Sequence, residues 1–238
     1  MNIITKNINP SKLNYLEGAV ILIDKPLEWT SFDVVSKLRS AISRFHDVKK
    51  TKAGHNGTLD PLATGLLMIF TGKHTKLIPN EENHDKTYEG IIKLGATTVS
   101  LDTEMPEIEF SSFSHVNKAK IENAMQSFIG ESEQEIPIFS ASKVDGKRMY
   151  KLARSGKSIE KKFKKVIFNE IQLKAYDAPF IHFNLICGKG TYVRAFARDL
   201  GIKLQTTGYL YALRRTAISN YSVKNAFDIH EFCEKLKS

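Results

Sequence analysis

The stretch Val166–Cys187, VIFNEIQLKAYDAPFIHFNLIC, indicates the fold class most directly. Apolar and polar residues alternate in Phe180–Cys187, which is the period of a half-buried β-strand. Asp177–Pro179 is typical of a turn, so we expect strands at Val166–Tyr176 and Phe180–Cys187 on either side of it. Strands this close in sequence imply at least partly antiparallel pairing.

Strand and helix patterns mingle on both sides of this hairpin. Further strands are predicted at Gly18–Ile23, Leu66–Phe70, Tyr88–Leu94 and Tyr209–Ile218, and Lys49–Gly57 is predicted to be a loop. Helices are predicted after Thr30 (with Phe32, Val35, Leu38 and Ile42 on one face), from Asn117 to Ile129, over Gly146–Ser155, from Thr191 to Gly201 and over Ala226–Leu236. We therefore expect one α+β domain over residues 1–238, with a mixed, largely antiparallel sheet flanked by helices.

The charge of the chain is unevenly distributed. The 238 residues carry a formal net charge of +9. Residues 143–165 hold ten Lys or Arg against two acidic residues, whereas residues 81–135 hold twelve acidic residues against four lysines. A basic run of this kind is typical either of a solvated face or of a surface that contacts a phosphate backbone.

Composition argues against several classes of protein. The two cysteines, Cys187 and Cys233, form no CxxC pair, which argues against a zinc site and a disulfide framework and favours a reducing cytoplasm. No apolar stretch approaches the ~20 residues that span a bilayer, so we expect no membrane association. The sequence shows neither a metal-ligand cluster nor a nucleotide-binding loop, so we expect no metal and no cofactor.

The segment Ala53–Leu67, AGHNGTLDPLATGLL, is the strongest candidate for chemistry. Its glycines allow close backbone approach, and Pro61 fixes the turn that follows Asp60. Asp60 is therefore held on a stiff loop that leads into an apolar strand. It could organise that loop as an Asx turn, or it could serve as a nucleophile, a general base or a metal ligand.

Two further segments carry candidate binding residues. In Cys187–Gly201, CGKGTYVRAFARDLG, a Gly-rich turn feeds a helix, and Arg194 lies in its first turn. That position suits an anionic partner, either a substrate phosphate or a protein carboxylate, although an ordinary surface arginine is the alternative. In Lys86–Gly90, KTYEG, the ring of Tyr88 could belong to the core or could stack on a base.

Six segments, in order along the chain, resemble motifs of the bacterial tRNA pseudouridine synthase B family. They are Leu22–Val35 (LIDKPLEWTSFDVV), Gly54–Leu67 (GHNGTLDPLATGLL), Lys86–Tyr88, Ser140–Arg154 (SASKVDGKRMYKLAR), Lys189–Leu200 (KGTYVRAFARDL) and Leu213–Arg215. Three departures stand out. Glu28 replaces a glycine, Asn56 replaces a threonine, and only Asp102 is kept of an acidic element. Family members usually continue into a C-terminal RNA-binding PUA domain, which we expect to be absent here.

The resemblance implies a pseudouridine synthase fold and an enzyme that isomerises uridine 55 in the T loop of tRNA without a cofactor. It implies that Asp60 is the nucleophile, acting on C1′ or C6 or abstracting a sugar proton, and that Arg194 pairs with it. It assigns substrate contacts to the stacking Tyr88, to Tyr192 and Leu213 in the base pocket, to His55 in the vacated T loop, and to Lys76 beside the active loop or a phosphate. Simple loop hydrogen bonding is the alternative for His55.

The resemblance also implies how the enzyme meets its partner. A base inside a folded T loop must be flipped out, at a cost of roughly a few kcal/mol. The partner is then the tRNA T arm, and the basic segment 143–165 is expected to contact its backbone in place of the PUA domain. We expect a cytoplasmic monomer with no protein partner.

Three other functions remain open on the sequence. One is a related synthase that acts on another uridine or another RNA. A second is a non-catalytic RNA-binding protein with a relic site. A third is a metal-dependent nuclease or phosphotransferase that uses Asp24, Asp60 and Asp102.

Overall fold

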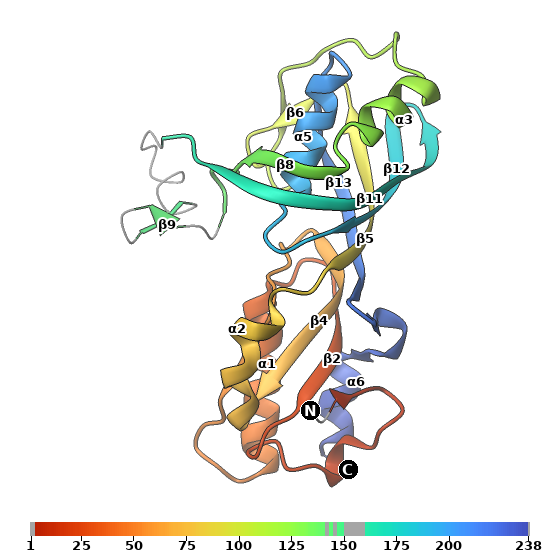
Figure 1. Ribbon diagram of the computed structural model, residues 1–238. Coiled ribbons are helices and arrows are strands. Elements are labelled where there is room, and N and C mark those ends of the chain that lie inside the picture. The colour runs from red at the N-terminus through yellow and green to blue at the C-terminus, as the bar shows by residue number, and fades with distance from the viewer. Residues whose placement is uncertain (1–2, 141–142, 145–146, 150–159, 238) are drawn as a thin grey trace. The chain divides into compact units, whose positions relative to one another are not determined.

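The computed structural model describes residues 3–140, 143–144, 147–149 and 160–237. The chain divides into two compact units (Figure 1). The terminal unit contains residues 1–88 and 214–238, and the central unit contains residues 89–213. The unit boundaries fall within strands β5 (Lys86–Leu94) and β13 (Gly208–Ile218). The helix predicted over Gly146–Ser155 lies largely outside the described residues.

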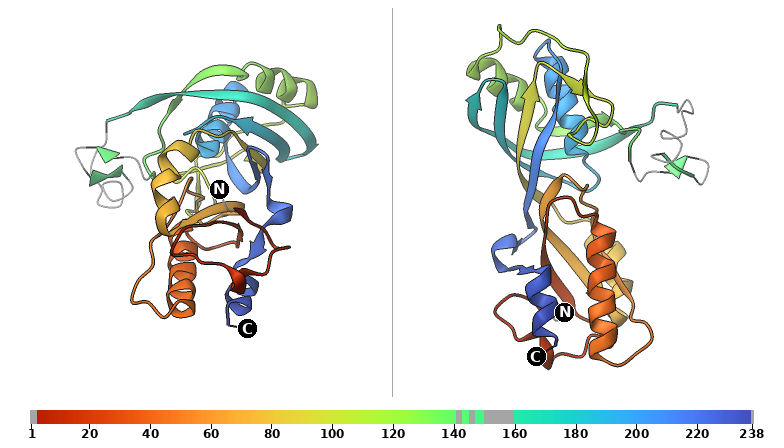
Figure 2. Two further views of the ribbon diagram at one scale, coloured as in Figure 1. Left: turned by 60° about the horizontal axis from the view of Figure 1, so that its bottom comes forward. Right: turned by 180° about the vertical axis from the view of Figure 1, so that it is seen from behind.

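The terminal unit is a small mixed sheet with its two longer helices on one face and the short α2 (Ile78–Glu81) against the other. Strand β2 (Val20–Lys25) runs antiparallel to β4 (Ala63–Thr71), which also pairs with β3 (Ala53–His55), while β1 (Ile3–Ile4) and β15 (Phe227–Asp228) run parallel to β2. Helices α1 (Ser31–Phe45) and α6 (Ile229–Lys235) cover the same face of this sheet (Figures 1 and 2). The remaining elements are η1 (Pro10–Lys12), η2 (Gly72–Leu77), β14 (Tyr221–Ser222) and η3 (Val223–Asn225).

Helix α1 begins where the sequence predicts. Thr30 caps it, because its hydroxyl accepts a hydrogen bond from the Asp33 amide at 3.0 Å while the Asp33 carboxylate accepts one from the Thr30 amide at 2.9 Å. Val35, Leu38 and Ile42 are buried as expected. The placement of Phe32 on that face is wrong, since its side chain is 64% exposed. The buried stripe already begins in the first turn, at Ser31, and continues through Val34 and Leu38, so Phe32 lies to one side of it.

The central unit confirms the predicted hairpin. Strand β11 (Phe163–Asp177) pairs antiparallel with β12 (Phe180–Cys187), with Ile171 opposite Leu185. The strand order is β13-β5-β12-β11-β8, with β8 spanning Gly130–Glu135. Helix α5 (Val193–Lys203) and the turn after α3 (Lys118–Gln126) contribute to an aromatic core that joins Phe128, Phe168, Phe183 and Phe196. The short strands are β6 (Thr97–Thr98), β7 (Glu107–Ile108), β9 (Lys143–Val144) and β10 (Lys147–Arg148).

Some predicted boundaries differ from the structure. The loop predicted at Lys49–Gly57 contains β3, and the helix predicted to run to Ile129 ends at Gln126. Gly130 instead begins β8, an acidic strand that the sequence analysis did not predict because it lacks apolar alternation. Two of its glutamates form ion pairs with lysines. Glu135 pairs at 3.1 Å with Lys161, which precedes β11, and Glu131 pairs at 2.7 Å with Lys165, which lies within β11. Part of the charge of segment 143–165 is therefore balanced within the protein.

The mixed, largely antiparallel α+β class is confirmed by these pairings. Cys187 is a buried free thiol of the core, as its alternating context predicts. Within the described ranges, no helix combines the length and the apolar character needed to cross a bilayer.

Candidate active site

The loop that carries Asp60 connects β3 to β4 and is tied to the segment before α1. The Ser31 hydroxyl accepts a hydrogen bond from the Leu59 amide at 2.8 Å and donates one to the Leu59 carbonyl at 3.0 Å. The Glu28 amide donates to the carbonyl of Pro61 at 2.9 Å. The residues on both sides of Asp60 are thus fixed by a second segment, which is the rigid support that a reacting carboxylate needs.

Two departures from the family motifs lie in this support. Glu28, which stands in place of a glycine, has a φ of 67°, in the left-handed region that glycine adopts freely. A side chain there costs about 1 kcal/mol, which a glycine would not incur. Asn56, which stands in place of a threonine, is buried, and its Nδ2 donates to the carbonyl of Glu81 at 3.2 Å. This bond ties the loop to α2.

Two buried cations lie beside the loop. Arg215 is 1% exposed and donates from Nε to the Leu66 carbonyl at 2.7 Å and from a terminal nitrogen to the Gly57 carbonyl at 3.0 Å. Lys25 is fully buried and donates to two carbonyls of the turn that follows it. Burial lowers the pKa of Lys25 to about 8, and the nearby negative charge of Asp60 opposes that shift. The terminal unit therefore places positive charge close to the candidate nucleophile.

The other predicted site residues of the terminal unit are His55, Lys76 and Tyr88. The ring of His55 accepts a hydrogen bond from the Gly57 amide at Nδ1, at 3.3 Å. Burial, with a smaller contribution from the Arg215 charge, lowers the pKa of His55, so its ring is neutral at pH 7. The loop hydrogen bond weighed for His55 is thus present. Tyr88 is 7% exposed, as expected for a ring in the core, and Lys76 is exposed on η2.

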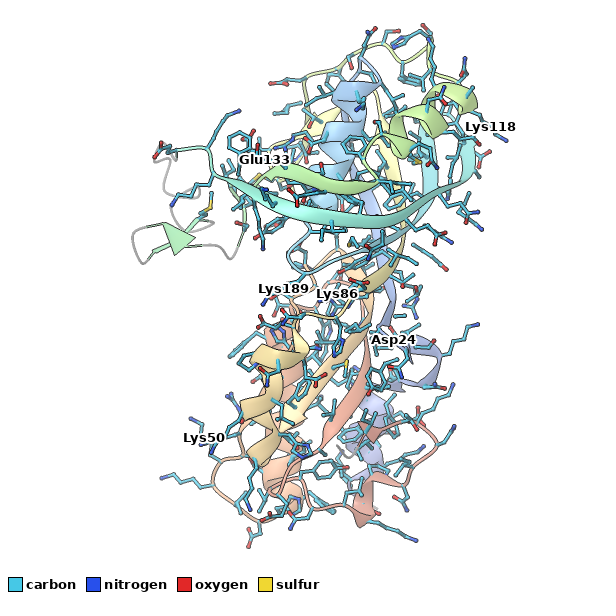
Figure 3. All side chains as sticks on the ribbon, viewed as in Figure 1. Asp24, Lys50, Lys86, Lys118, Glu133 and Lys189 are labelled. Carbon is cyan, nitrogen blue, oxygen red and sulfur yellow. The ribbon has the colours of Figure 1, made fainter. Side chains whose placement is uncertain are left out.

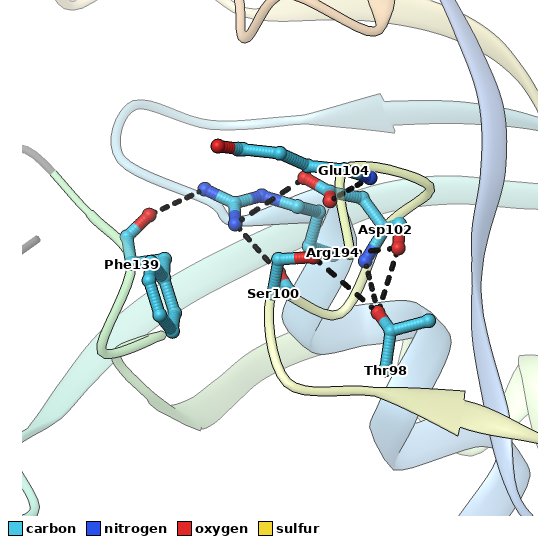
Figure 4. A network of polar contacts seen from close by, with 6 residues as sticks. All are labelled: Thr98, Ser100, Asp102, Glu104, Phe139 and Arg194. Carbon is cyan, nitrogen blue, oxygen red and sulfur yellow. Dashed lines mark hydrogen bonds and ion pairs between the residues drawn. The ribbon is translucent and has the colours of Figure 1, made fainter. Parts of the chain in front are cut away.

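Arg194 lies in the first turn of α5 and is held inside the central unit (Figure 4). It is 4% exposed and donates to the carbonyls of Ser100 at 2.7 Å and Phe139 at 2.9 Å. A terminal nitrogen lies 3.5 Å from Oδ2 of Asp102, which is 2% exposed. Arg194 is therefore not an ordinary surface arginine, and one partner is a protein carboxylate. The predicted pair with Asp60 would join residues of different units and stays a prediction.

Tyr192 and Leu213 complete the predicted set. Tyr192 is the N-cap residue of α5, and its backbone is bound by the side-chain amide of Gln134. Gln134 accepts from the Tyr192 amide at 3.0 Å and donates to the Tyr192 carbonyl at 3.2 Å. Leu213 is half-buried on β13.

Two of the three carboxylates invoked for a metal site are engaged by arginines. Arg214 donates to both oxygens of Asp24, at 3.1 and 2.6 Å, and Asp102 is paired with Arg194. In the part of the chain that the structure describes, no three His, Cys, Asp or Glu side chains gather as a metal site. The geometry thus gives no support to the nuclease alternative.

The pattern of the TruB family of pseudouridylate synthases, N-terminal domain, matches residues 45–193. A protein of Phocaeicola vulgatus named tRNA pseudouridine synthase B is 46% identical over 224 residues, which cover 94% of this chain and 95% of that protein. The chain belongs to the TruB family of pseudouridylate synthases. A protein of the same name from Flavobacterium johnsoniae is 46% identical and covers 94% of this chain and 98% of its own length. The sequence-based expectation of a pseudouridine synthase is confirmed.

Solved structures place this TruB-family chain in the pseudouridine synthase fold. A chain from the structure titled "Crystal Structure of a Cbf5-Nop10-Gar1 Complex" has a TM-score of 0.68 and 22% sequence identity. The alignment covers 94% of this chain and 57% of that chain. A chain of an H/ACA RNP bound to a substrate RNA has a TM-score of 0.65 and 21% identity, with 95% and 57% coverage. At this identity the likeness concerns the fold alone.

Several supporting residues of the TruB-family site were not assigned a role from the sequence. They are Lys25, Ser31, Gln134 and Arg215, together with Asp102, for which the sequence offered only the role of a metal ligand. All five are at most 4% exposed. Lys25 and Gln134 both lie outside the strands predicted from the sequence, so no local pattern marked them as buried polar groups that require partners. Except for Lys25, which binds carbonyls of the turn that follows it, these residues have partners too far along the chain to be read from spacing.

Proposed function

We propose that this TruB-family enzyme converts uridine 55 in the T loop of tRNA to pseudouridine. The observation that carries the proposal is the loop of Asp60, which is fixed on both sides by the segment from Glu28 to Ser31 and flanked by buried Lys25 and Arg215. A carboxylate held in this way suits a reversible covalent step. The relatives' name, tRNA pseudouridine synthase B, supports tRNA as the substrate.

The reaction is redox-neutral. The N1–C1′ bond of uridine breaks, the uracil turns, and a C5–C1′ bond forms while the C5 proton is lost and N1 gains one. Asp60 acts as the nucleophile that attacks C1′ or C6, or as the base that abstracts a sugar proton. As a redox-neutral isomerisation, the reaction needs neither an electron carrier nor phosphate energy, and the enzyme acts without a cofactor.

Substrate binding requires the uridine to leave the T-loop stack, at a cost of about a few kcal/mol. Tyr88 stacks on the extruded base, while Tyr192 and Leu213 line its pocket. His55, neutral at pH 7, fills the space that the base leaves, and Arg194 pairs with Asp60. Lys76 contacts a phosphate of the T arm.

The proposal also includes the domain organisation, the oligomeric state and the cellular compartment of the enzyme. Residues 1–238 act as one catalytic domain, and the enzyme works as a monomer without a protein partner. The cytoplasm is its compartment, since tRNA is the substrate and both cysteines are free thiols.

The decisive experiment uses an unmodified tRNA transcript and carbodiimide mapping of pseudouridine. We expect product at uridine 55, in the presence of a chelator as well as in its absence, and none in a transcript with cytidine 55. Product at another uridine would point to the related-synthase alternative. Dependence on Mg²⁺ beyond its effect on tRNA folding, checked with a prefolded stem-loop, would favour the metal-dependent alternative.

A further inference from the structure

A pocket of about 350 Å³ lies in the terminal unit and is lined mainly by lysines. Lys50 and Lys52 come from the segment before β3, and Lys73 and Lys76 come from η2. All four are exposed, and Lys50 projects outward from the fold (Figure 3). Lys73 pairs with Glu17 at 2.5 Å, and the described residues that line the pocket include no acidic side chain. The pocket therefore carries a clear positive excess.

The sheet brings the two lysine segments together. Ala53 of β3 lies opposite Thr71 of β4, so the residues just outside this pair also meet, and the Gly72 amide donates to the Lys52 carbonyl at 3.0 Å. Gly72 has a φ of 50°, and a Cβ there would collide with the carbonyl of Leu16. The lysines are thus positioned by backbone pairing and not by chance proximity on a mobile surface.

A second observation points to a ligand. Thr51 lies between the two lysines of the first segment, lines the pocket and is 2% exposed. Its hydroxyl has no hydrogen-bond partner among the described residues. A buried hydroxyl without a partner costs about 1–3 kcal/mol, and a rotation of the Thr51 side chain would offer this hydrogen bond to an anion oxygen in the pocket.

We propose that this lysine pocket binds a phosphodiester of the RNA substrate, remote from the flipped base. The inference rests on the proposed function. Lysines bind phosphate as point charges without reading a base, and the pocket offers Leu16 alone as an apolar side chain, so it suits a backbone and not a nucleotide. Lys52 precedes β3 and His55 ends it, a separation of about 10 Å at the rise of a strand. RNA seated on the Asp60 loop therefore has backbone within reach of the pocket.

The test combines Lys50→Ala with Lys73→Ala, leaving Lys76 in place. We expect KM for tRNA to rise about fivefold with kcat unchanged. The plot of the logarithm of the binding constant against the logarithm of the salt concentration should become less steep by about 1. The matched control removes two other exposed lysines of the same unit, Lys12 and Lys37, and should change the slope less. Equal slopes in the two double variants would overturn the assignment.

A second experiment distinguishes an RNA phosphodiester from free inorganic phosphate as the ligand of the pocket. In backbone NMR spectra, both inorganic phosphate and a T-arm stem-loop should shift the Thr51 and Gly72 amides of the native chain, and the stem-loop should do so at far lower concentration. Response to phosphate alone would mean a free-anion site and contradict the proposal. An enzyme that binds RNA through the pocket yet forms no pseudouridine would instead refute the proposed function.

A different observation supports a positioning residue in the central unit. The Gln134 side chain is 2% exposed, and its amide forms two hydrogen bonds to the backbone of Tyr192, as donor and as acceptor. No side chain caps α5 at Tyr192, so Gln134 fixes the residue at which that helix begins. We infer that Gln134 positions Tyr192 for base binding, a role that again rests on the proposed function.

The test replaces Gln134 by Leu, which removes both hydrogen bonds at similar volume. We expect kcat to fall about tenfold while KM for tRNA stays within twofold, because the loss concerns the orientation of the base and not RNA binding. Ile171→Ala, a core truncation in the same unit, provides a control of comparable instability that should keep kcat. Equal kcat losses in the two variants would reduce Gln134 to a purely structural role. Full turnover by Tyr192→Ala would instead remove the base-pocket role of Tyr192.

Discussion

Asp60→Asn is expected to lower pseudouridine formation by about 10⁴-fold or more while RNA binding stays within a few-fold. An amide has the shape of the carboxylate but is not a nucleophile or a base at neutral pH. The backbone turn is kept, because the Ala63 amide donates to the backbone carbonyl of Asp60 at 3.0 Å. Single-turnover mapping on tRNA transcript, together with filter binding, measures both quantities.

Asp47→Asn is the matched control for this substitution. Asp47 is exposed in the same unit and has a φ of 50°, a conformation that asparagine tolerates well. We expect its turnover to equal that of the native chain. Full turnover by Asp60→Asn would show that the nucleophile is another group. A loss of binding equal to the loss of turnover would show that Asp60 organises the loop and does not react.

The sequence predicts those helices and strands in which buried apolar residues recur with the period of the element. The β11–β12 hairpin follows from apolar alternation, and the cap of α1 follows from Thr30 and Asp33. Strand β8 could not be predicted in this way. Two of its glutamates are stabilised by ion pairs to Lys161 and Lys165. Each lysine lies more than 25 positions further along the chain than its glutamate.

The catalytic loop was recognised from its sequence, but its supports were not. The hydrogen bond of Arg215 to Leu66 spans 149 positions, and that of Gln134 to Tyr192 spans 58. Neither spacing is visible as a periodicity, because each contact exists only once the sheet has formed. A buried polar residue signals that a partner is needed, and only the fold says which one.

The second large effect concerns the ion pair in the central unit. Asp102→Asn is expected to lower the free energy of unfolding by about 3 kcal/mol, because it removes a carboxylate that faces the buried guanidinium of Arg194. Asparagine can still accept the hydrogen bond that the Glu104 amide makes to the Asp102 side chain at 2.9 Å, so the charge is the main change. Urea unfolding should show a lower midpoint with an unchanged slope.

Glu131→Gln is the control. It removes the carboxylate of another ion pair of the same unit, the pair of Glu131 with Lys165. Both of its side chains are largely exposed, at 62% and 77%, so solvent screens the pair and we expect no measurable shift of the midpoint. The double variant Asp102→Asn with Arg194→Met should be more stable than the sum of the single changes, because no buried charge then lacks its carboxylate. Strict additivity would mean that Asp102 and Arg194 stabilise the unit independently, and that Arg194 owes its burial to the carbonyls of Ser100 and Phe139.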